Sequence, residues 1–419
     1  MSTISDKTIV AVATPSGEGA LAIIRLSGKD SLLIADSVWK GTKLNDCPSH
    51  TVHLGNIINE NGDILDQAVA TVFRGPNSFT GEDVVEFSLH GSPWIKREVI
   101  NLLLRCGARG AEPGEFSRRA YLNGRMDLAS AEGIANLIAS SSRAAHRLAM
   151  QQTRGAFSKE FNELRDKLIE LASLLELELD FSEEDVEFAD RTRLIETATL
   201  LLLKIDRLTA SYATGRAIKE GVPVVIAGMP NVGKSTLLNT LLQEEKAIVS
   251  DIPGTTRDII EDTCEIEGVL FRFVDTAGLR DSADTIESIG IERARKRLAQ
   301  ASIVLWLIDP LAPIGDQIGE MNSTLKELSP EQKIIPVITK ISLPEISESH
   351  IESIQKYLNA VLLSDETSNG IQNIVKISAA EGTGLELLCE ALKKASTSDF
   401  DPEKELLLTN ARHYGDLLA

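Results

Sequence analysis

The sequence predicts a multidomain α/β protein, in which an α+β domain is followed by an α-helical domain that carries an inserted domain with a mostly parallel sheet. The length of 419 residues fits about three domains. The pattern of the sequence changes twice along the chain: short β-rich runs give way to helical periodicity, and apolar strand-like runs then alternate with helices. Hydrophobic residues make up 43% of the chain, which is enough for more than one core.

Residues 1–120 are expected to form the α+β domain. Short β-rich runs recur there and are separated by turn sequences such as Pro15-Ser16-Gly17 and Asn61-Gly62-Asp63. One helix is expected around Trp94–Cys106. The predicted strands are Thr8–Ala13, Leu21–Leu26, Ala68–Phe73 and Val84–Leu89.

The helical domain is expected in two parts, residues 121–218 and 383–419. From Phe161 to Leu179, apolar residues recur at steps of three or four, which is the period of one helix face. The stretch from Leu194 to Tyr212 repeats this pattern. Acidic residues between Glu176 and Asp190 fit a solvated face or a loop between two helices.

Residues 219–382 are expected to form the inserted domain. Near-continuous apolar runs alternate there with helical segments, which is typical of a parallel sheet covered on both faces. Helical periodicity returns from Leu385 to Leu392 and again from Glu403 to Leu418. The predicted strands are Val222–Ala227, Leu270–Val274, Ile303–Ile308, Ile334–Ile338 and Ile374–Ile377.

Charge and cysteine content exclude several classes of protein. The net charge of −19 excludes a generally basic nucleic-acid-coating protein. Arginines between residues 105 and 154 still form a local basic excess, for which phosphate contact and ordinary pairing with acidic neighbours are alternatives. No apolar run approaches the roughly 18 residues of a membrane helix, and no secretory signal is visible, so a cytoplasmic protein without membrane contact is expected. The 4 cysteines form no CxxC pair and fit reduced thiols.

One motif assigns the inserted domain to the P-loop proteins. Gly228–Ser235 matches G-x-x-x-x-G-K-[ST] and lies between a predicted strand and the helical run Thr236–Leu242, the context that this motif requires. Backbone amides of such a loop surround phosphate oxygens. Lys234 is expected to reach the β and γ phosphates, and Ser235 to ligate Mg²⁺. The expected nucleotide contacts in this segment are Asn231, Val232, Gly233, Lys234, Ser235 and Thr236.

Three further segments fit the spacing of a GTPase. Asp275-Thr276-Ala277-Gly278 follows a predicted strand, where an Asp can hold the Mg²⁺ shell and a Gly amide can sense a γ-phosphate. Ser378-Ala379-Ala380 follows the last strand, where GTPases place a loop that contacts the base. A switch-like loop, in which Thr256 is expected to complete the Mg²⁺ ligands, contains Ser250, Asp251, Ile252, Pro253, Gly254, Thr255 and Thr256. These spacings resemble the translation-factor-like GTPases, and an ATPase of the same fold is the alternative.

Two positions depart from the GTPase pattern. Leu279 follows Asp-Thr-Ala-Gly where Gln is common, so another group is expected to orient the attacking water. The segment Thr339-Lys340-Ile341-Ser342 stands where the pattern is Asn-Lys-x-Asp. Lys340 can still lie against the base. The hydroxyl of Ser342 is a poorer partner for guanine than a carboxylate, because charged hydrogen bonds are roughly twice as strong as neutral ones.

The outer segments of the chain narrow the resemblance to one family. The segments that carry it are Thr8–Pro15, Ile24–Gly28, Gly75–Asp83, His90-Gly91, Glu112–Phe116 and Ala120–Leu128. They are similar to the MnmE (TrmE) family of tRNA modification GTPases. The resemblance runs from about residue 8 to the end of the chain and includes both the outer and the inserted domains, in the order that the family has.

The resemblance implies a homodimer formed through the N-terminal domain, which binds a 5-formyl- or 5,10-methylene-tetrahydrofolate. Members of the family act on tRNA with the FAD- and NADH-using partner MnmG, in a complex of the heterotetramer type. They install a (carboxymethyl)aminomethyl group on carbon 5 of the wobble uridine, and the folate supplies the one-carbon unit. GTP hydrolysis drives a cycle in which two GTPase domains meet, and K⁺ promotes that meeting.

The resemblance also implies roles for individual residues of the GTPase domain. Glu287 matches the catalytic Glu of the family and would orient the attacking water, which Leu279 cannot do. Lys234 would stabilise the transferred phosphoryl group. A monovalent cation can offset transition-state charge, the task of an arginine finger elsewhere. The matching K⁺ ligands are Asn231, Ser250, Ile252 and Thr255.

Three residues match folate-binding positions of the family: Arg25, Glu86 and Arg125. The carboxylate of Glu86 suits the amino-pyrimidine edge of a pterin, and the two guanidinium groups suit carboxylates. Arg125 stands where Lys is common in the family, which keeps the charge but changes the geometry.

At its C-terminal end the chain differs from the family. Members continue past the segment Thr409–His413 with more helix and end in a Cys-x-Gly-Lys tail, whereas this chain stops at Ala419. None of the cysteines here lies in such a motif. The absence of the tail is either a truncation or natural, and we expect this chain to hydrolyse GTP without completing the tRNA modification.

Two other functions stay open. One is a regulatory switch GTPase of the ribosome-assembly type, in which the nucleotide state only gates the binding of a partner. The other is a folate-binding scaffold with weakened nucleotide use. The folate-type motifs of the N-terminal domain argue against the first. The joint presence of Lys234, Ser235, Thr256, Asp275 and Glu287 argues against the second.

Overall fold

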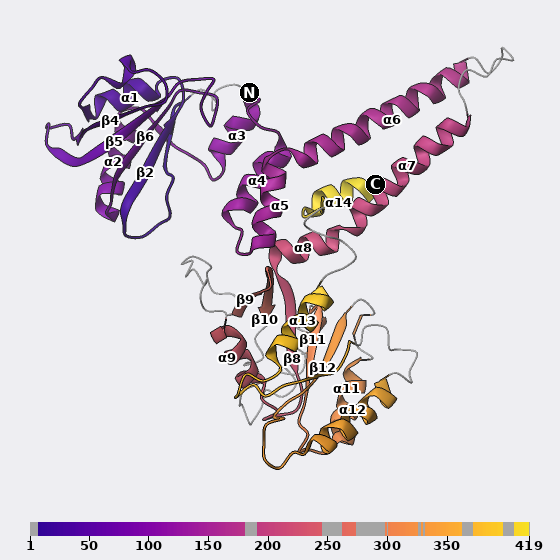
Figure 1. Cartoon of the computed structure of the whole chain (residues 1–419). Helices are drawn as coiled ribbons and strands as arrows, with labels where there is room; N and C mark the ends of the chain where they lie inside the picture. Colours follow the sequence, from indigo (N-terminus) through magenta and orange to yellow (C-terminus); the bar gives the residue numbers. More distant parts are fainter. Residues whose placement is uncertain are drawn as a thin grey trace, which may run out of the picture. The chain divides into compact units, whose positions relative to one another are not determined.

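The computed structural model describes residues 7–180, 191–244, 262–273, 298–299, 301–325, 328–329, 332–362, 372–396 and 406–418 (Figure 1). The chain divides into two units. The first comprises Met1–Gly133 with Thr153–Ser158, and the second comprises Ile134–Gln152 with Lys159–Ala419. None of the helices in the described ranges has the length and apolar character that crossing a membrane requires.

The first unit contains a 7-stranded sheet. Its strands are β1 (Ile9–Val12), β2 (Gly19–Ser27), β3 (Trp39–Lys40), β4 (Thr51–Ile58), β5 (Ile64–Phe73), β6 (Val84–Gly91) and β7 (Arg109–Gly110). They lie in the order β3-β4-β5-β6-β2-β1-β7, and only the β1–β7 pair is parallel. All four strands predicted in this region are confirmed, whereas β3, β4 and β7 were not predicted.

Helices cover one face of this sheet. They are α1 (Ser31–Ser37) and α2 (Pro93–Arg105), and a further helix, α3 (Glu115–Leu122), follows β7. Successive strand residues point to opposite faces, so Ile24 of β2 and Phe87 of β6 face the core. Both side chains are fully buried with Leu103 of α2. The helix predicted around residues 94–106 is therefore present, and the α+β arrangement is confirmed.

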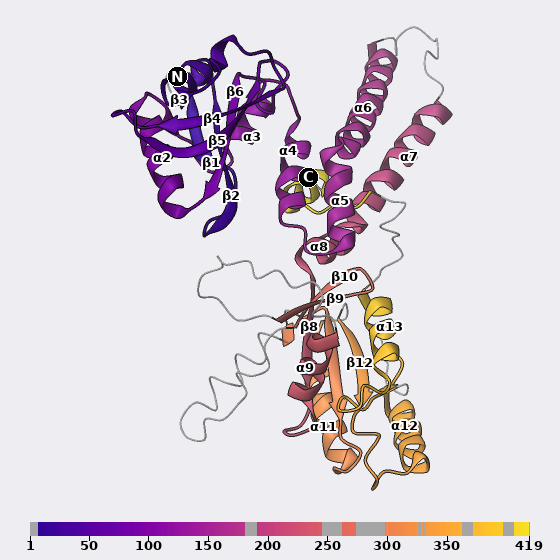
Figure 2. The same cartoon turned by 60° about the vertical axis from the view of Figure 1, so that its left-hand side comes forward.

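Helices also form the segments that come before and after the inserted sheet in the sequence. They are α4 (Leu128–Ile138), α5 (Arg143–Thr153), α6 (Ala156–Asp180), α7 (Arg191–Ala210), α8 (Tyr212–Glu220) and α14 (Ala411–Leu418). Helices α6 and α7 lie side by side in both cartoon views (Figures 1 and 2). Nζ of Lys204 on α7 donates to Oε1 of Glu160 on α6 at 2.8 Å. Of the predicted acidic stretch, residues 176–180 end α6, and residues 181–190 lie outside the described ranges.

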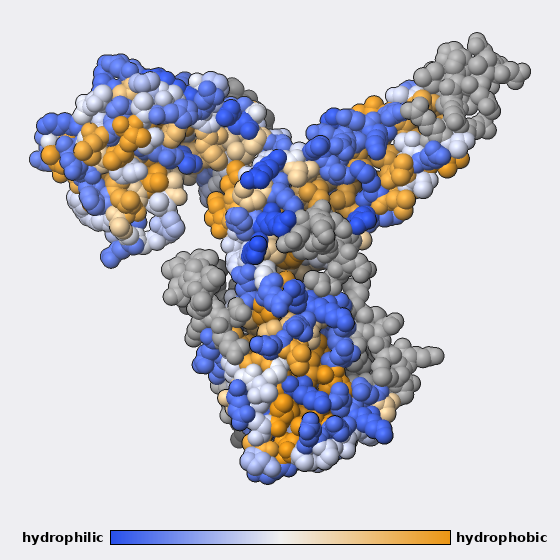
Figure 3. Space-filling model, viewed as in Figure 1, coloured by the Kyte–Doolittle hydropathy of each residue, from blue (hydrophilic) through white to orange (hydrophobic). Residues whose placement is uncertain are grey.

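Helices α6 and α7 also expose apolar side chains. Figure 3 shows apolar surface along this helix pair. The exposed apolar residues are Leu168, Ile169, Leu175, Ile195, Leu200, Leu202 and Leu203. They alternate with a buried face that includes Leu164 and Leu201, so each helix carries apolar residues on more than one side.

The segment before α14 corrects one expectation. The helix predicted from Glu403 begins only at Ala411, because residues 406–410 are not helical. Leu407 and Leu408 are fully buried there, and the Leu408 amide donates to the Ser211 hydroxyl at 3.0 Å. Leu407 packs with Ala145 and Leu148 of α5 and with Ile218 of α8. A non-helical backbone places Leu407 among residues of α5 and α8.

The inserted part contains a 6-stranded sheet in the order β13-β12-β11-β8-β10-β9. Its strands are β8 (Val222–Ala227), β9 (Asp262–Ile266), β10 (Val269–Phe273), β11 (Ile303–Ile308), β12 (Lys333–Ile338) and β13 (Val375–Lys376). All pairs are parallel except β9–β10. The mostly parallel sheet predicted from the apolar runs is confirmed. The antiparallel edge strand β9 was not predicted.

Helices cover both faces of this sheet. They are α9 (Lys234–Glu244), α11 (Ile314–Leu325), α12 (Glu348–Leu362) and α13 (Leu385–Ser396). Val224 of β8 belongs to a core cluster with residues of α9 and α13, whereas Val225 packs in a second cluster with residues of α11 and α12. Successive side chains of one strand thus pack against two different layers of helices. In open parallel sheets of this kind, ligands bind at the carboxyl ends of the strands.

Candidate functional site

The loop between β8 and α9 is shaped by three unusual backbone conformations. Asn231 and Gly233 adopt positive φ values of 61° and 109°, and α9 begins directly afterwards at Lys234. Gly228 has a φ of 136°, and a Cβ atom there would lie 2.6 Å from the carbonyl oxygen of Leu307. Glycine is therefore required where the loop passes β11. The fully buried Val232 anchors the loop in the core. Such a turn leaves amide groups at the start of α9 directed at a bound anion.

The ammonium group of Lys234 is held against this loop. Its Nζ donates to the carbonyl oxygens of Gly228 at 2.6 Å and of Met229 at 3.0 Å. Burial lowers the pKa of Lys234 below its ordinary value of 10.5, and the charge of Glu320 opposes this shift. The lysine is thus a partly desolvated cation whose present partners are neutral carbonyls. A phosphate would be a stronger partner for it.

The loop after β12 contacts the phosphate-binding loop. The buried Thr339 hydroxyl donates to the carbonyl oxygen of Val232 at 3.0 Å. Lys340 has a positive φ of 58°, and its Nζ lies 2.6 Å from Oδ2 of Asp309 at the end of β11. These contacts bring the predicted residues 339–340 to the same edge of the sheet as residues 231–236.

The loop after β13 lies at the same edge of the sheet and forms a corner there with the loop after β12. The Ser342 and Ser378 hydroxyl oxygens lie 2.7 Å apart, which joins this loop to the one after β12. The Thr240 hydroxyl of α9 donates to the carbonyl oxygen of Ala379 at 3.0 Å. The backbone amide of Ser378 donates to Thr383 at 2.9 Å and closes the loop on itself. Residues 378–380 therefore lie beside the loop after β12 and beside α9.

The other predicted nucleotide and ion contacts lie outside the described ranges. They are Ser250, Asp251, Ile252, Pro253, Gly254, Thr255, Thr256, Asp275, Thr276, Ala277, Gly278 and Glu287. Of the predicted K⁺ ligands the structure describes Asn231, and of the predicted Mg²⁺ ligands it describes Ser235 in the first turn of α9. A Ser hydroxyl is an oxygen ligand of the kind that Mg²⁺ takes. Within the described part of the chain, no cluster of three or more His, Cys, Asp or Glu residues could hold a metal ion.

In the first unit, Arg25 and Glu86 form a cross-strand pair. They are direct partners in the β2–β6 ladder, and Nε of Arg25 donates to Oε1 of Glu86 at 2.6 Å. The guanidinium carbon lies 5.1 Å from the ring centroid of Phe79 and 5.5 Å from that of Phe116. Both distances are within the range of a cation–π contact.

Arg125, the third predicted folate-binding residue, lines a pocket of about 450 Å³. The pocket is formed by His50, Phe73, Asn77, Ser78, Phe79 and Arg125. Phe79 lines this pocket together with Arg125 and also contacts Arg25, whose hydrogen-bond partner is Glu86. An aromatic ring, a carboxylate and two guanidinium groups provide stacking, an acceptor for an amino-pyrimidine and anchors for carboxylates.

A buried ion network next to the pocket was missed from the sequence. Nη1 of Arg119 lies 3.1 Å from both carboxylate oxygens of Glu82, and its Nη2 lies 3.2 Å from Oε1 of Glu115. The Ser27 hydroxyl donates to Glu82 at 2.7 Å. Glu82 therefore ties the loop that carries Phe79 to α3 and β2. The spacing of Glu115 and Arg119 is that of a helical i,i+4 pair, which was the available signal.

Glu115 is the most perturbed carboxylate of this network. Burial disfavours its charged form, but hydrogen bonds from Arg109, from the Glu112 amide and from Arg119 outweigh burial and lower the pKa of Glu115 to about 2. Its side chain is 2% exposed. The carboxylate is therefore a fixed negative charge that depends on its hydrogen bonds from Arg109 and Arg119.

Four arginines of the local basic excess pair with acidic residues. Nε of Arg105 lies 2.7 Å from Glu60, and Nη2 of Arg118 lies 3.3 Å from Glu112. Arg109 and Arg119 belong to the ion network around Glu115. For these four residues the structure supports ordinary pairing with acidic neighbours over a patch for RNA phosphates.

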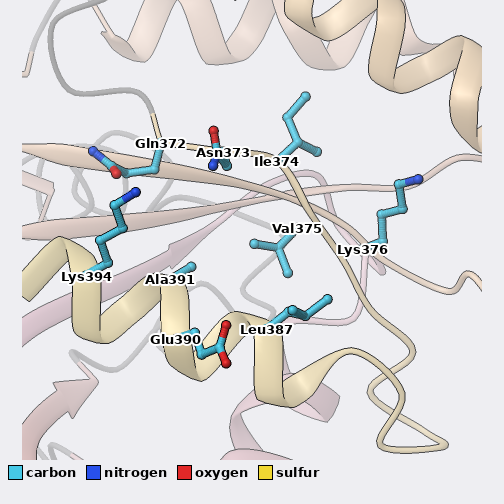
Figure 4. Close-up of a pocket in the computed structure, with 9 residues that line it drawn as sticks. All are labelled: Gln372, Asn373, Ile374, Val375, Lys376, Leu387, Glu390, Ala391 and Lys394. Carbon is cyan, nitrogen blue, oxygen red and sulfur yellow. The ribbon is translucent and has the colours of Figure 1, made fainter.

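Another pocket, of about 500 Å³, lies between the β13 segment and α13 (Figure 4). Its lining residues are Gln372, Asn373, Ile374, Val375, Lys376, Leu387, Glu390, Ala391 and Lys394. Figure 4 shows Val375 and Leu387 on the two opposing sides of this pocket. None of these residues was predicted as a site residue from the sequence.

Comparisons with known proteins cover almost the whole chain. The family model described as the GTP-binding protein TrmE N-terminus matches residues 8–125, and the model described as the MnmE helical domain matches residues 128–418. The tRNA modification GTPase MnmE of Cytophaga hutchinsonii is 49% identical over 410 residues, which are 98% of this chain and 85% of that protein. Its counterpart in Flavobacterium johnsoniae is 46% identical over 419 residues, which are 99% and 88% of the two chains.

Among solved structures, a similar chain is Era from Aquifex aeolicus, solved with GDP and AlF4⁻. It is 27% identical, and the match covers 45% of this chain and 62% of that one with a TM-score of 0.33. The two MnmE relatives extend the similarity to both units, because their matches leave almost no part of this chain uncovered.

Proposed function

Because the chain belongs to the MnmE family of tRNA modification GTPases, we propose that it hydrolyses GTP as a component of the machinery that modifies the wobble uridine of tRNA at carbon 5. The observation that carries this proposal is the corner of the inserted sheet. There Lys234 lies on its phosphate-type loop, and the loops that contain Ser342 and Ser378 meet beside it. A nucleoside triphosphate has its phosphates and its base at the two ends, and this corner offers partners for both.

The described residues of this corner have distinct tasks. Lys234 exchanges the carbonyls of Gly228 and Met229 for the β and γ phosphates, and the amides of residues 231–236 hold the other phosphate oxygens. Lys340 lies against the base, and the loop 378–380 contacts its edge. Ser235 holds Mg²⁺ together with Thr256, and the bound ion neutralises phosphate charge.

The remaining catalytic residues of the proposal come from the family resemblance. Glu287 orients the attacking water, because Leu279 cannot. Asn231, Ser250, Ile252 and Thr255 hold K⁺, which supplies positive charge near the phosphates. Asp275 holds the Mg²⁺ shell and the Gly278 amide senses the γ-phosphate, while Thr276, Ala277 and residues 250–256 supply further nucleotide contacts.

The first unit is proposed to bind a tetrahydrofolate, either the 5-formyl or the 5,10-methylene form. Glu86 accepts hydrogen bonds from the amino-pyrimidine edge of the pterin, and Arg25 holds that carboxylate in place at 2.6 Å. Phe79 offers its ring for stacking, and Arg125 meets a carboxylate of the glutamate tail. The folate, when bound, supplies the one-carbon unit of the modification.

The assembly is proposed to follow the family as well. Residues 1–120 form the folate-binding and dimerisation domain, residues 121–218 with 383–419 form the helical domain, and residues 219–382 form the GTPase domain. Two copies of the chain act with the FAD-dependent partner MnmG on tRNA. K⁺ promotes the meeting of the two GTPase domains.

The proposal is tested by steady-state hydrolysis of GTP by the full chain in matched KCl and NaCl buffers with Mg²⁺. We expect turnover to be at least about tenfold faster in KCl, since compensation of transition-state charge is worth large rate factors in GTPases. Asn231→Gly is the informative variant, because glycine keeps the positive φ of 61° while it removes the amide ligand. It should hydrolyse GTP equally slowly in both salts.

Lys234→Ala serves as the inactive reference in both salts. Absence of GTP hydrolysis by the unaltered chain in KCl would overturn the proposed activity. Equal rates in the two salts with normal turnover would remove K⁺ from the proposal and leave the GTPase assignment in place.

A further inference from the structure

The corner formed by the loops after β12 and β13 meets a base with neutral hydroxyl groups. The Ser342 and Ser378 oxygens are 2.7 Å apart, and either hydroxyl can be the donor of this hydrogen bond. Ser378 is 2% exposed, whereas Ser342 lies at the surface. The buried hydroxyl therefore holds the exposed one in place. The hydroxyl of Ser342 can therefore act as either a hydrogen-bond donor or an acceptor.

One carboxylate near this corner, that of Asp309, already has hydrogen-bond partners. Oδ2 of Asp309 binds Nζ of Lys340 at 2.6 Å, and Oδ1 accepts the Leu311 amide at 3.0 Å. Both of its oxygens thus have partners within the described structure. Asp309 cannot replace the carboxylate that Ser342 lacks without giving up one of them.

The purine bases that carry an oxygen on carbon 6 differ from one another at carbon 2. Guanine carries an amino group there, xanthine carries an oxygen and hypoxanthine carries only hydrogen. A carboxylate at position 342 would accept hydrogen bonds from N1–H and the amino group of guanine, would repel the oxygen of xanthine and would lose one bond with hypoxanthine. A Ser hydroxyl can accept a hydrogen bond from the amino group of guanine and can donate one to the oxygen of xanthine. With hypoxanthine it leaves no charged group unpaired.

The neighbouring backbone offers a different kind of contact. Among the residues that the structure describes, the amides of Ala379 and Ala380 donate to no backbone carbonyl. Amide donors suit an oxygen on carbon 6 of a purine, whereas the amino group of adenine at that position cannot accept from them.

We propose that Ser342, held by Ser378, makes this site indifferent to the group on carbon 2 of the base. The substrate class is then the 6-oxopurine nucleoside triphosphates, namely GTP, ITP and XTP, with ATP excluded. This inference rests on the proposed GTPase function and specifies the substrate of that same site. Ser342 is accordingly the residue that sets base selectivity in this chain.

The test compares the four nucleotides on the full-length chain, both by kcat/KM and by their competition against a fluorescent GTP analogue. We expect GTP, ITP and XTP to agree within about tenfold, because no charged hydrogen bond is gained or lost among them. ATP should be weaker than GTP by at least about a hundredfold, since the amide donors of the loop would be left unpaired.

The variant Ser342→Asp should create selectivity. A carboxylate at this exposed position is expected to favour GTP over ITP by about ten- to a hundredfold, which is the range for one charged hydrogen bond. XTP should lose still more, because its oxygen would face the carboxylate. Ser349→Asp adds the same charge at an exposed position in the first turn of α12 and should leave all ratios unchanged.

The outcomes separate the two proposals. If the unaltered chain prefers GTP over both ITP and XTP by more than about a hundredfold, Ser342 does not relax selectivity and the inference is wrong, while the GTPase function stands. If Ser342→Asp leaves the ratios unchanged, position 342 does not face carbon 2, and the inference is equally wrong. If no nucleotide binds or is hydrolysed, the proposed function itself fails.

Discussion

Arg25 and Glu86 lie 61 residues apart in the sequence and directly opposite each other in the β2–β6 ladder, with Nε of the arginine 2.6 Å from Oε1 of the glutamate. The pair is only partly buried, with 24% and 20% of the two side chains exposed. Both side chains therefore keep exposed atoms that a ligand can contact. The ladder fixes their separation, so the carboxylate is oriented before any ligand arrives.

Replacing Glu86 with Gln should weaken the binding of 5-formyl-tetrahydrofolate by about ten- to a hundredfold, because a charged hydrogen-bond acceptor is lost. Isothermal titration of the full chain measures this change. The matched control is Glu60→Gln, since Glu60 also pairs with an arginine but is 65% exposed. Equal affinities for the unaltered chain and Glu86→Gln would exclude Glu86 from the folate site.

Replacing Arg119 with Met should lower the free energy of unfolding of the first unit by about 3 kcal/mol, because Glu115 would lose one of its arginine partners in a buried position. Trp39 and Trp94 lie in this unit, so their fluorescence in a Trp306→Phe background reports its unfolding in urea.

Arg105→Met is the control, because Arg105 and Glu60 are exposed and such pairs contribute about 1 kcal/mol or less. We also expect Arg119→Met to weaken folate binding, since Glu82 would no longer tie the Phe79 loop to α3. Equal stability losses for the two variants would contradict the buried network.

The stability of the first unit should depend on pH through Glu115. Its pKa is about 2 in the folded chain and near 4.5 when unpaired, so the stabilisation is complete above pH 4.5 and is lost as the pH falls towards 2. The full difference corresponds to about 3 kcal/mol.

The measurement is the difference in unfolding free energy between the unaltered chain and Glu115→Gln, which cannot titrate at this position. It should shrink by about 1.4 kcal/mol for each pH unit below the unfolded pKa. A difference that stays constant between about pH 5 and 3 would show that Glu115 keeps an ordinary pKa in the folded state.

The affinity for GTP should begin to fall at a lower pH than it would if Lys234 had the pKa of an ordinary lysine. Burial lowers the pKa of Lys234 in the free protein, and bound phosphate favours the protonated form, so GTP binding weakens as the pH rises through that lowered value. The dissociation constant should then rise by about tenfold for each pH unit.

Fluorescence titration between about pH 7 and 10 measures this dependence. Lys234→Arg keeps its charge throughout and corrects for deprotonation of guanine itself. If the unaltered chain and Lys234→Arg lose affinity in parallel, then Lys234 does not titrate in this range.

The inserted sheet was largely predictable because its strands are buried on both faces and read as apolar runs. Val222–Ala227 and Ile303–Ile308 were predicted with the bounds that the structure has. The first sheet was harder to predict. Its strand β4 exposes Val52 and Leu54 and contains Gly55, whose missing Cβ makes room for the Trp39 indole. Such a sequence reads as a loop, although a neighbouring side chain explains the glycine.

The candidate sites also have a part that the sequence predicts and a part that it does not. The phosphate-type loop is a contiguous motif, so spacing alone located Lys234 and Ser235. The ion network joins Ser27, Glu82 and Arg119, which meet only because distant strands and α3 come together. No local period carries that information. Arg25 and Glu86 were named from the family resemblance, and only the strand register explains why they belong together.

Leu407, packed against Ile218, joins the two places where the chain enters and leaves the inserted sheet. During synthesis the whole inserted sheet emerges before Leu407 does, and domains generally fold as units in the order in which they appear. The helices around Ala145 and Leu148 therefore lack Leu407 and Leu408 from their core until the sheet has been synthesised. The inserted sheet thus lies, in the sequence, between two parts of the helical core. That core can be completed only after the sheet has been synthesised.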